Sequence, residues 1–294
     1  MKSPIILIAN PAAKRASPRK IRKAVELLRS AGHEVIVHLT EKRGDAEDFA
    51  RKASKEEASF FLAAGGDGTF NEVMNGIANT GMKMAILPMG TTNVLAKELG
   101  IPEDVKGAIH VALNGSVRSV SLGEIEFTRH SSLVTRHFFL MAGIGFDGES
   151  VYGINEALKK YWGKGAYILS GLKTFAGYSP AELTFVLNGQ TFTGYSAIIG
   201  KASKYGGNFR ITPDARLENP ELYVCIMHGN KPSDILRYVY GILSEKHLGF
   251  KDITYLKANS VSVEGLAHIQ IDGDYLGTTP ATITVVPDAI KLIY

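Results

Sequence analysis

The residues Gly65-Gly66-Asp67-Gly68-Thr69 are the part of this sequence whose types and spacing point most directly to chemistry. Glycines carry no Cβ atom and therefore let the backbone approach a bulky anion. The first N–H groups of a helix that follows such a turn have no internal partner and can bind phosphate. Asp67 would repel that phosphate unless a cation such as Mg²⁺ lies between them. The segment therefore predicts a site for a nucleoside triphosphate and its metal ion.

Apolar residues on both sides of this segment predict the elements that position it. Phe60–Ala64 has the apolar run of a buried strand, and the apolar residues within Val73–Ile77 are spaced like one face of a helix. Thr69 and Glu72 match the T-x-x-E capping box, which predicts that the helix begins at Thr69. This order of strand, turn and helix makes a phosphate-binding corner, although Gly-Gly-Asp-Gly also occurs as a tight turn without a ligand.

Strands and helices alternate throughout residues 1–122. Strands are predicted at 5–9, 34–39, 60–64 and 84–87, and helices from 18 to about 31 and at 45–53, 69–78, 93–99 and 103–113. Such alternation predicts an α/β domain with a parallel sheet and helices on both faces. Ligands of these sheets bind at the carboxyl ends of the strands, which is where the glycine segment lies.

The pattern changes after Leu122 to a series of short strands. Asn188-Gly189 separates two alternating runs and predicts a two-residue hairpin. Two stretches, Asn155–Phe175 and Ser233–Leu243, are helix-like. We therefore expect residues 123–294 to form a mainly antiparallel β-sandwich domain, whose last strand can return to the first domain. A substrate cleft is expected between the two domains.

The composition is that of an ordinary soluble globular protein. The 294 residues are 45% hydrophobic and 21% charged, and a net charge of +4 provides no dominant basic field, which argues against a nucleic-acid partner. The single cysteine, Cys225, lies in an apolar strand-like run and is predicted to be a buried thiol in a reducing compartment. No apolar run is long enough to span a membrane, so a cytoplasmic location is expected.

Several further motifs occur in order along nearly the whole chain. They are Asn10-Pro11, Gly65–Glu72, Pro88–Asn93, Gly143–Asp147, Pro213–Ala215 and Asp272-Gly273. Together they resemble the diacylglycerol kinase catalytic-domain family, which includes bacterial lipid kinases and the sphingosine and ceramide kinases. The resemblance implies a nucleotide domain like that of phosphofructokinase and a β-sandwich lipid domain. It also implies ATP-dependent phosphorylation of a lipid hydroxyl, such as that of diacylglycerol, at the inner membrane surface in phospholipid biosynthesis.

Carried over position by position, the resemblance implies which residues contact the nucleotide and perform the chemistry. The nucleotide contacts would come from Asn10, Thr40, Gly65, Gly66, Asp67, Gly68, Thr69, Asn71, Glu72, Gly90 and Thr91. Asp67 would also help to hold Mg²⁺ with the phosphates, and Asp274 would orient or deprotonate the lipid hydroxyl. ATP and Mg²⁺ are the expected cofactors, and a membrane lipid is the expected partner.

The sequence departs from the family pattern at positions that bear on the chemistry. The family's Asp-Gly-Glu triplet is Asp272-Gly273-Asp274 here, so the expected base is one methylene shorter. A displacement of about 1 Å can cost roughly 10²-fold in rate. Ser121 and Val94 stand where the family often has aspartate. Asn219-Pro220-Glu221 replaces an Asp-Gly-Leu-type loop that binds a structural Mg²⁺ in several bacterial members, which argues against that metal site.

Three other segments have more than one interpretation. Gly143–Gly148 matches G-x-G-x-x-G, but it lacks the acidic residue that a dinucleotide fold needs about 20 residues later, so we interpret it as a turn beside the cleft. The cations within Lys14–Lys23 could attract anionic lipid, Lys14 and Arg15 could contact the phosphates of ATP, or most of these cations could lie on a solvated helix face. Lys159–Lys164, which contains Trp162, suits either an interfacial segment or a helix docked on the sheet.

Two other functions remain open from the sequence. NAD kinases share Gly-Gly-Asp-Gly, although the motif at Pro88–Asn93 argues against them. The other is a catalytically impaired protein that binds nucleotide and lipid for regulation, because Ser121, Asn219 and Asp274 all depart from the family pattern. The sequence does not identify the lipid, since contacts to acyl chains discriminate poorly. A homodimer also stays open.

Overall fold

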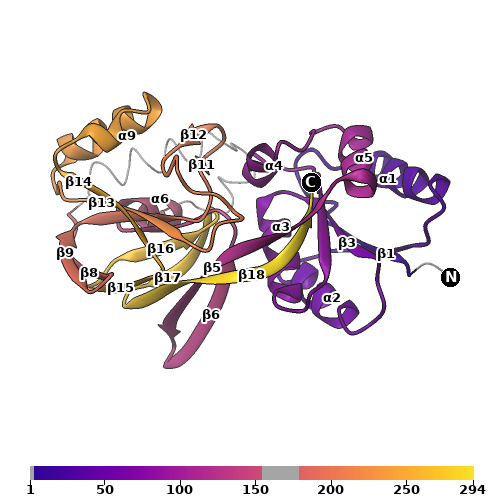
Figure 1. Cartoon of the computed structure of the whole chain (residues 1–294), viewed down its shortest axis with the longest axis horizontal. Coiled ribbons are helices and arrows are strands. Elements are labelled where there is room, and N and C mark those ends of the chain that lie inside the picture. The colour runs from indigo at the N-terminus through magenta and orange to yellow at the C-terminus, as the bar shows by residue number, and fades with distance from the viewer. Residues whose placement is uncertain (1–2, 154–178) are drawn as a thin grey trace. The chain divides into compact units, whose positions relative to one another are not determined.

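The chain forms two compact units in a computed structural model, which describes residues 3–153 and 179–294 (Figure 1). The first unit comprises the residues up to Leu122 together with Gly206–Asn208 and Val286–Tyr294, and the second comprises Gly123–Tyr205 and Phe209–Val285. The predicted helix at Asn155–Phe175 and the cationic segment Lys159–Lys164 lie outside the described residues.

The first unit is built on a parallel sheet. Its strands are β1 (Ile5–Ala9), β2 (Val35–Leu39), β3 (Phe60–Gly65), β4 (Lys83–Pro88) and the last residues of β18 (Ala281–Ile293), in the order β2-β1-β3-β4-β18. Every residue of β1 is buried, as expected for a parallel strand that is covered on both faces. Leu292 of β18 pairs with Met84 of β4, so the last residues of the chain complete this sheet.

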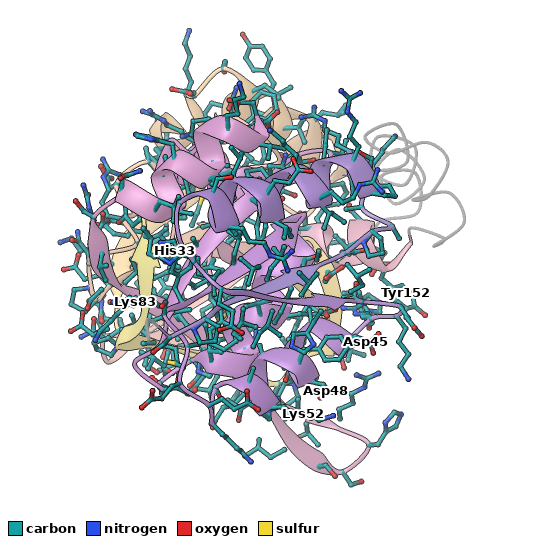
Figure 2. All side chains as sticks on the ribbon, turned by 90° about the vertical axis from the view of Figure 1, so that its right-hand side faces the viewer. His33, Asp45, Asp48, Lys52, Lys83 and Tyr152 are labelled. Atoms are coloured by element: carbon teal, nitrogen blue, oxygen red, sulfur yellow. The ribbon has the colours of Figure 1, made fainter. Side chains whose placement is uncertain are left out.

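Helices cover both faces of this sheet (Figure 1). They are α1 (Pro18–Ser30), α2 (Asp45–Ala53), α3 (Asp67–Ile77), α4 (Val94–Leu99) and α5 (Val105–Asn114). α1 begins where the sequence predicts, because the Ser17 side chain accepts a hydrogen bond from the Lys20 N–H. α1 packs against α5 and α2 packs against α3. Polar residues of α2, among them Asp48 and Lys52, are exposed to solvent (Figure 2).

The second unit contains two mainly antiparallel sheets. One has the order β14-β13-β10-β7-β16-β17, and the other contains β15, β8 and β9 with β6 and parts of β5 and β18. The bounds are β5 (Val117–Arg129), β6 (Ser132–Phe138), β7 (Met141–Ile144), β8 (Leu183–Leu187), β9 (Gln190–Gly194), β10 (Ser196–Gly200), β13 (Leu222–Met227), β14 (Ile253–Ala258), β15 (Ser260–Glu264), β16 (His268–Ile271) and β17 (Asp274–Thr278). The remaining elements are α6 (Phe146–Tyr152), β11 (Lys204–Tyr205), β12 (Phe209–Arg210), α9 (Pro232–Leu243) and the 3-10 turn η1 (His247–Gly249).

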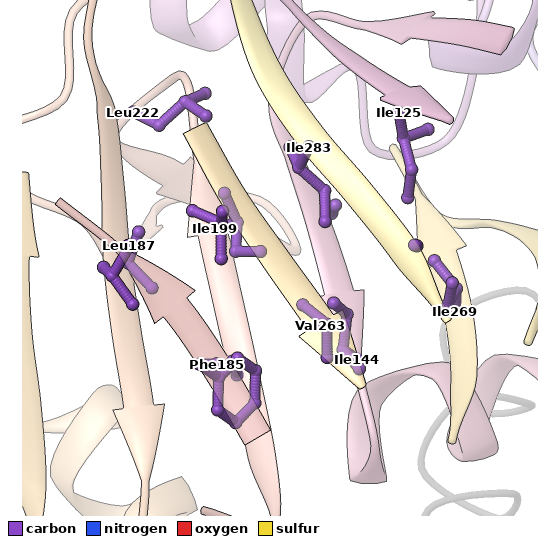
Figure 3. Packing of buried hydrophobic residues seen from close by; sticks show 14 of the residues in the cluster. Ile125, Ile144, Phe185, Leu187, Ile199, Leu222, Val263, Ile269 and Ile283 are labelled. Atoms are coloured by element: carbon purple, nitrogen blue, oxygen red, sulfur yellow. The ribbon is translucent and has the colours of Figure 1, made fainter. Parts of the chain in front are cut away.

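Apolar side chains from both of these sheets form one core (Figure 3). Ile144 and Ile199 come from the first sheet and Phe185 and Ile283 from the second, and all four are fully buried. Inward-facing residues of two packed sheets make the interior of a β-sandwich. Cys225 is also buried, as predicted, and burial raises the pKa of its thiol to about 12. The two units thus confirm the predicted fold class of an α/β domain and an antiparallel β-sandwich.

Local predictions in the second unit have mixed outcomes. Asn188 and Gly189 have φ values of 54° and 74° and join β8 to β9, which confirms the predicted two-residue hairpin. The alternating run that follows Gly189 is not one strand, because it is divided into β9 and β10 at Tyr195, whose N–H donates to the Met227 carbonyl. Over the residues that the structure describes, no helix combines the length and apolarity that a membrane crossing requires.

Candidate functional site

The predicted nucleotide residues of the first unit gather at one edge of its parallel sheet. Asn10 follows β1, Thr40 follows β2, the glycine turn follows β3, and Gly90 follows β4. The chain passes from β1 to β2 on one side and then returns to β3 on the other side, as the order β2-β1-β3-β4 shows. Such a reversal leaves a crevice outside the carboxyl ends of the central strands, where sheets of this kind bind ligands.

The glycine turn after β3 contacts the glycine turn after β4. The Met89 N–H donates to the Gly65 carbonyl at 2.6 Å. A Cβ atom placed on Gly90 would lie 2.6 Å from the Cα atom of Gly66, so a side chain there would require the backbone to move. The two glycine motifs, which are separate in the sequence, therefore form one structure.

Asn10 connects β1 to this pair of turns. Its backbone N–H donates to the Ala64 carbonyl at 2.8 Å, and its side-chain Nδ2 donates to Thr69 Oγ1 at 3.5 Å. The loop that follows Asn10 reaches β4, because the Arg15 N–H donates to the Met89 carbonyl at 2.9 Å. Thr40 is buried, and its N–H donates to the Ala9 carbonyl at 2.9 Å.

The N-terminus of α3 begins inside the glycine turn. The helix starts at Asp67, and its N-cap residue is Gly66, which has no side chain to cap the first turn. The prediction that Thr69 begins the helix in a capping box with Glu72 is therefore wrong. An uncapped first turn at the end of a strand offers backbone N–H groups to an anion.

Asp67 holds the start of α4. One carboxylate oxygen accepts the Val94 N–H at 3.0 Å and the other accepts the Leu95 N–H at 3.1 Å. Burial raises the pKa of Asp67, and these hydrogen bonds offset part of that effect. Asp67 thus has a structural role that the sequence did not indicate, in addition to its place beside the glycines.

Glu72 points to a different helix. Its carboxylate accepts the Gly44 N–H at 3.0 Å and the Ala46 N–H at 3.2 Å, which places it at the N-terminus of α2. A carboxylate is stabilising there because it satisfies unpaired N–H groups and complements the helix dipole. Asn71 is buried in α3, and its carbonyl and Oδ1 both accept hydrogen bonds from Asn75 at 2.9 Å.

A polar cluster that the sequence did not predict lies after β4. Asn93 Oδ1 accepts the Gly90 N–H at 2.9 Å, and Asn93 Nδ2 donates to Glu103 at 3.4 Å. Arg15 forms an ion pair with Glu103. Burial opposes the ionisation of Glu103, but hydrogen bonds from Arg15 and Asn93 outweigh it, so the pKa of Glu103 is lowered. The cluster fixes the turn that carries Gly90 and Thr91.

The second unit contains the other predicted catalytic segment, at a hairpin between β16 and β17. Asp272 and Gly273 have φ values of 50° and 88°, the conformation that an Asp-Gly pair adopts in a two-residue hairpin. The Asp272 carboxylate accepts the N–H groups of Phe139, Leu140 and Met141 at 2.8–3.1 Å. Asp274 is partly buried and is the first residue of β17. Asp272 and Gly273 thus form a fixed turn, and Asp274 follows it with a carboxylate side chain.

Asp147, which ends the motif Gly143–Asp147, is buried and is linked to this hairpin through Gln270. Gln270 Nε2 donates to Asp147 at 2.6 Å, and the Oε1 atom of Gln270 accepts the Gly273 N–H at 2.7 Å. Tyr205 also donates to Asp147. Burial raises the pKa of Asp147, and the hydrogen bonds from Tyr205 and Gln270 offset part of the effect. Asp147 therefore positions the hairpin through Gln270.

The predicted turn at Gly143–Gly148 connects β7 to α6 in this cluster. Gly145 has a φ of 81°, which glycine adopts without strain. A Cβ atom on Gly148 would lie 2.8 Å from the Ile269 nitrogen, so this glycine lets α6 pack closely on β16. The segment is a packing turn in the second unit.

Two carbonyl groups of the loop that precedes Asn219 are bound by a buried lysine. Lys201, which is fully buried, donates through Nζ to the carbonyls of Arg216 and Leu217 at 2.5 and 3.0 Å. An ammonium group already neutralises these carbonyl dipoles. In residues 3–153 and 179–294 there is no group of three or more His, Cys, Asp or Glu side chains arranged to hold a metal ion.

Comparisons with known proteins agree with this architecture. The family model for the diacylglycerol kinase catalytic domain matches residues 4–125, and the model for the YegS C-terminal NAD kinase beta sandwich-like domain matches residues 141–294. A diacylglycerol kinase of Bacillus subtilis (strain 168) is 30% identical over 282 residues, which cover 93% of this chain and 90% of the relative. A diacylglycerol kinase of Staphylococcus aureus (strain bovine RF122 / ET3-1) is 29% identical, covering 94% of this chain and 87% of the relative.

Solved structures share the fold. A crystal structure of a putative diacylglycerol kinase from Bacillus anthracis str. Sterne matches with a TM-score of 0.81 and 21% identity, covering 100% of this chain and 96% of the other. Yeast NADH kinase, solved in complex with NADH, matches with a TM-score of 0.57 and 12% identity, covering 99% of this chain and 83% of the other. The second likeness is more distant and concerns the fold alone.

Proposed function

Because this chain belongs to the diacylglycerol kinase family and is a lipid kinase, we propose that it transfers the γ-phosphate of ATP to the hydroxyl group of a membrane lipid such as diacylglycerol. The observation that carries the proposal is the pair of glycine turns at the strand-order reversal of the first unit. The uncapped N-terminus of α3 lies in the same turn and supplies donors for phosphate oxygens.

In this proposal the first unit binds ATP with Mg²⁺. Bound Mg²⁺ neutralises charge on the phosphates during phosphoryl transfer. Asp67 can hold the ion, since an ionised carboxylate has about four acceptor positions and the two backbone N–H groups occupy only one on each oxygen. The hydrogen bond from Asn10 to Thr69 would hold the glycine turn for the phosphates, and Thr91 would add a hydroxyl group after β4.

The second unit supplies the acceptor side of the reaction. The lipid hydroxyl oxygen attacks the γ-phosphorus, the bond to the β–γ bridging oxygen breaks, and ADP leaves. Asp274 orients the hydroxyl and accepts its proton. Its position depends on the Asp272-Gly273 turn, which the Asp272 hydrogen bonds and the Gln270–Gly273 contact hold in place.

A radiolabelled ATP assay with a panel of acceptors tests this proposal. Diacylglycerol, phosphatidylglycerol and a sphingoid base are offered in mixed micelles, and NAD is offered in solution. Label on a lipid supports the proposal and names the acceptor class. Label on NAD in preference to every lipid would revive the NAD kinase alternative. A folded protein that binds ATP and labels no acceptor would support the regulatory alternative that the shorter Asp274 suggests.

A further inference from the structure

Helix α9 is anchored on the second unit by one face. Ile235, Tyr238 and Gly241 are buried. The Tyr238 hydroxyl donates to Asp252 at 2.5 Å and accepts the Gly229 N–H at 2.7 Å. A Cβ atom on Gly241 would lie 3.0 Å from the His247 Cα atom, which shows how closely this face packs. The helix therefore keeps a fixed rotation about its axis.

The opposite face of α9 is apolar although it is exposed. Leu236, Val239, Tyr240 and Leu243 have exposed fractions of 56%, 42%, 66% and 54%. Their spacing of three, four and seven residues places them in one stripe along the helix. A helix on the surface of a globular protein usually presents polar residues on this face, so the stripe is suited to an apolar environment outside the protein.

Charges around α9 complement an anionic surface. Asp234 and Asp252, which lie on and beside the helix, are both paired with Arg237. Lys231 precedes the helix, and Lys246 and Lys251 follow it, and all three are exposed. Glu245 is the exposed acid in this region. Cations are therefore present at both ends of the apolar stripe, while Arg237 offsets one of the two negative charges of Asp234 and Asp252.

We propose that α9 is the helix by which this kinase docks on a bilayer that contains anionic phospholipid. The stripe Leu236, Val239, Tyr240 and Leu243 enters the boundary between headgroups and acyl chains, and the three lysines contact headgroup phosphates. The inference rests on the proposed function, because an enzyme that phosphorylates a lipid of the bilayer must work at its surface. It adds a specific docking surface, fixed in rotation by Tyr238.

Binding to vesicles tests the docking surface directly. The full chain is sedimented with vesicles of phosphatidylcholine alone or with phosphatidylglycerol added. The variant Leu236→Gln/Leu243→Gln keeps good helix formers at both positions, and its partition coefficient should fall at least tenfold. The control variant Leu133→Gln/Leu266→Gln removes two leucines that are each 69% exposed but lie on β6 and on the β15–β16 turn. It should bind vesicles within twofold of the native chain.

The lysines give a second, independent measurement. Lys246→Gln/Lys251→Gln should weaken binding to the anionic vesicles by roughly fivefold for each charge removed and leave binding to phosphatidylcholine unchanged. Equal binding of the native chain and the α9 leucine variant would overturn the proposal. The proposal would also be overturned if the native chain is a dimer, the leucine variant is a monomer, and the two bind vesicles equally. In that case α9 would be an interface between two protein chains.

Kinase assays separate this proposal from the proposed function. With a short-chain diacylglycerol dissolved in water, the α9 leucine variant should keep the native rate, and on vesicles its rate should fall with its binding. If the native chain phosphorylates no lipid but binds vesicles through α9, the proposed function fails and the docking surface stands. If it phosphorylates the soluble lipid and the leucine variant is equally active on vesicles, the docking surface is wrong.

Discussion

Gly66 and Gly90 lie so close together that a Cβ atom on Gly90 would stand 2.6 Å from the Cα atom of Gly66. The two residues lie in the turns that follow neighbouring strands, β3 and β4, and these turns are joined by the hydrogen bond from the Met89 N–H to the Gly65 carbonyl. The nucleotide site proposed above therefore depends on two backbones in contact, and a methyl group between them should disturb both turns.

Gly90→Ala should destabilise the chain by about 1–3 kcal/mol, as overpacking of a tight site does. It should also raise the KM for ATP, because the displaced turn carries Thr91. Urea denaturation and steady-state kinetics measure the two effects. Gly249→Ala is the matched control, since nothing lies within 4 Å of a Cβ atom there. A Gly90→Ala protein with native stability and native KM would show that the contact is unimportant.

Asp67 combines a structural contact with a proposed role in metal binding, and two substitutions separate them. Asp67→Ala removes the acceptor at the start of α4 and should cost about 1–2 kcal/mol of stability, as the loss of a helix cap does. Asp67→Asn keeps one acceptor oxygen and should cost less. Both variants should lose most of their kcat if Asp67 holds Mg²⁺. An Asp67→Asn enzyme with native kcat would leave the residue with its structural role alone.

Asp274 is predicted to act on the lipid hydroxyl. Asp274→Asn should lower kcat by about 10²-fold or more, the range of general base catalysis, with little change in melting temperature because the side chain is partly exposed. Asp274→Glu restores the longer side chain of the family pattern. If that variant has turnover and the native chain has none, the native protein is a kinase that has lost its activity.

The ion pair of Arg237 and Asp252 predicts a dependence of stability on pH. The hydrogen bond from Arg237 holds the pKa of Asp252 at about 2. The folded pKa is lower than the unfolded value of about 4, so the stabilisation is complete above pH 4 and is lost as the pH falls towards 2. Asp252→Asn should therefore cost about 1–2 kcal/mol at pH 7, after allowance for solvent screening. The native and variant unfolding free energies should converge near pH 2.

The contact of Lys201 with two carbonyl groups predicts that the loop around Asn219 keeps its conformation without a bound metal ion. Chelation of divalent ions from the protein without nucleotide should leave its melting temperature unchanged. Lys201→Met keeps the length of the side chain but removes the Nζ donor from both carbonyls, of which that of Arg216 retains the Asn219 N–H, and this loss should cost about 1–3 kcal/mol. Lys251→Met, at an exposed position, is the control. A fall in melting temperature on chelation would contradict this interpretation.

The sequence predicted what local patterns determine. Asn188-Gly189 has a backbone geometry that few residues other than glycine or asparagine adopt, and a Cβ atom on Gly65 or Gly66 would come too close to Thr69 or Gly90. The strands around both segments have a clear pattern of apolar residues. The α/β and β-sandwich fold classes could be predicted from the spacing of apolar residues along the strands and helices. The start of α3 was misplaced by two residues, because Thr69 and Glu72 fit a capping box while tertiary contacts gave Glu72 a different partner.

The remaining contacts join residues that are far apart in the chain. Glu72 accepts the N–H of Ala46, which lies 26 residues earlier, Asp147 contacts Gln270 across 123 positions, and Arg15 pairs with Glu103 across 88. The repeating pattern of apolar residues that predicts a single helix or strand carries no information about contacts between such distant residues. Lys201 gave no signal either, since a lysine in a sequence is usually exposed, and its burial depends on two carbonyls in a loop that follows it.

The strand β18 begins beside β15, where Ile283 pairs with Val261, and ends beside β4, where Leu292 pairs with Met84. β18 thereby joins parallel and antiparallel strands in one ten-stranded sheet, which is not complete until this strand is in place. During synthesis the helices of the first unit can form early, but β4 keeps an open edge until residues about two hundred positions later have emerged from the ribosome. Folding of the nucleotide unit is thereby tied to the synthesis of β18, and a chain cut before this strand would expose strand edges in both units.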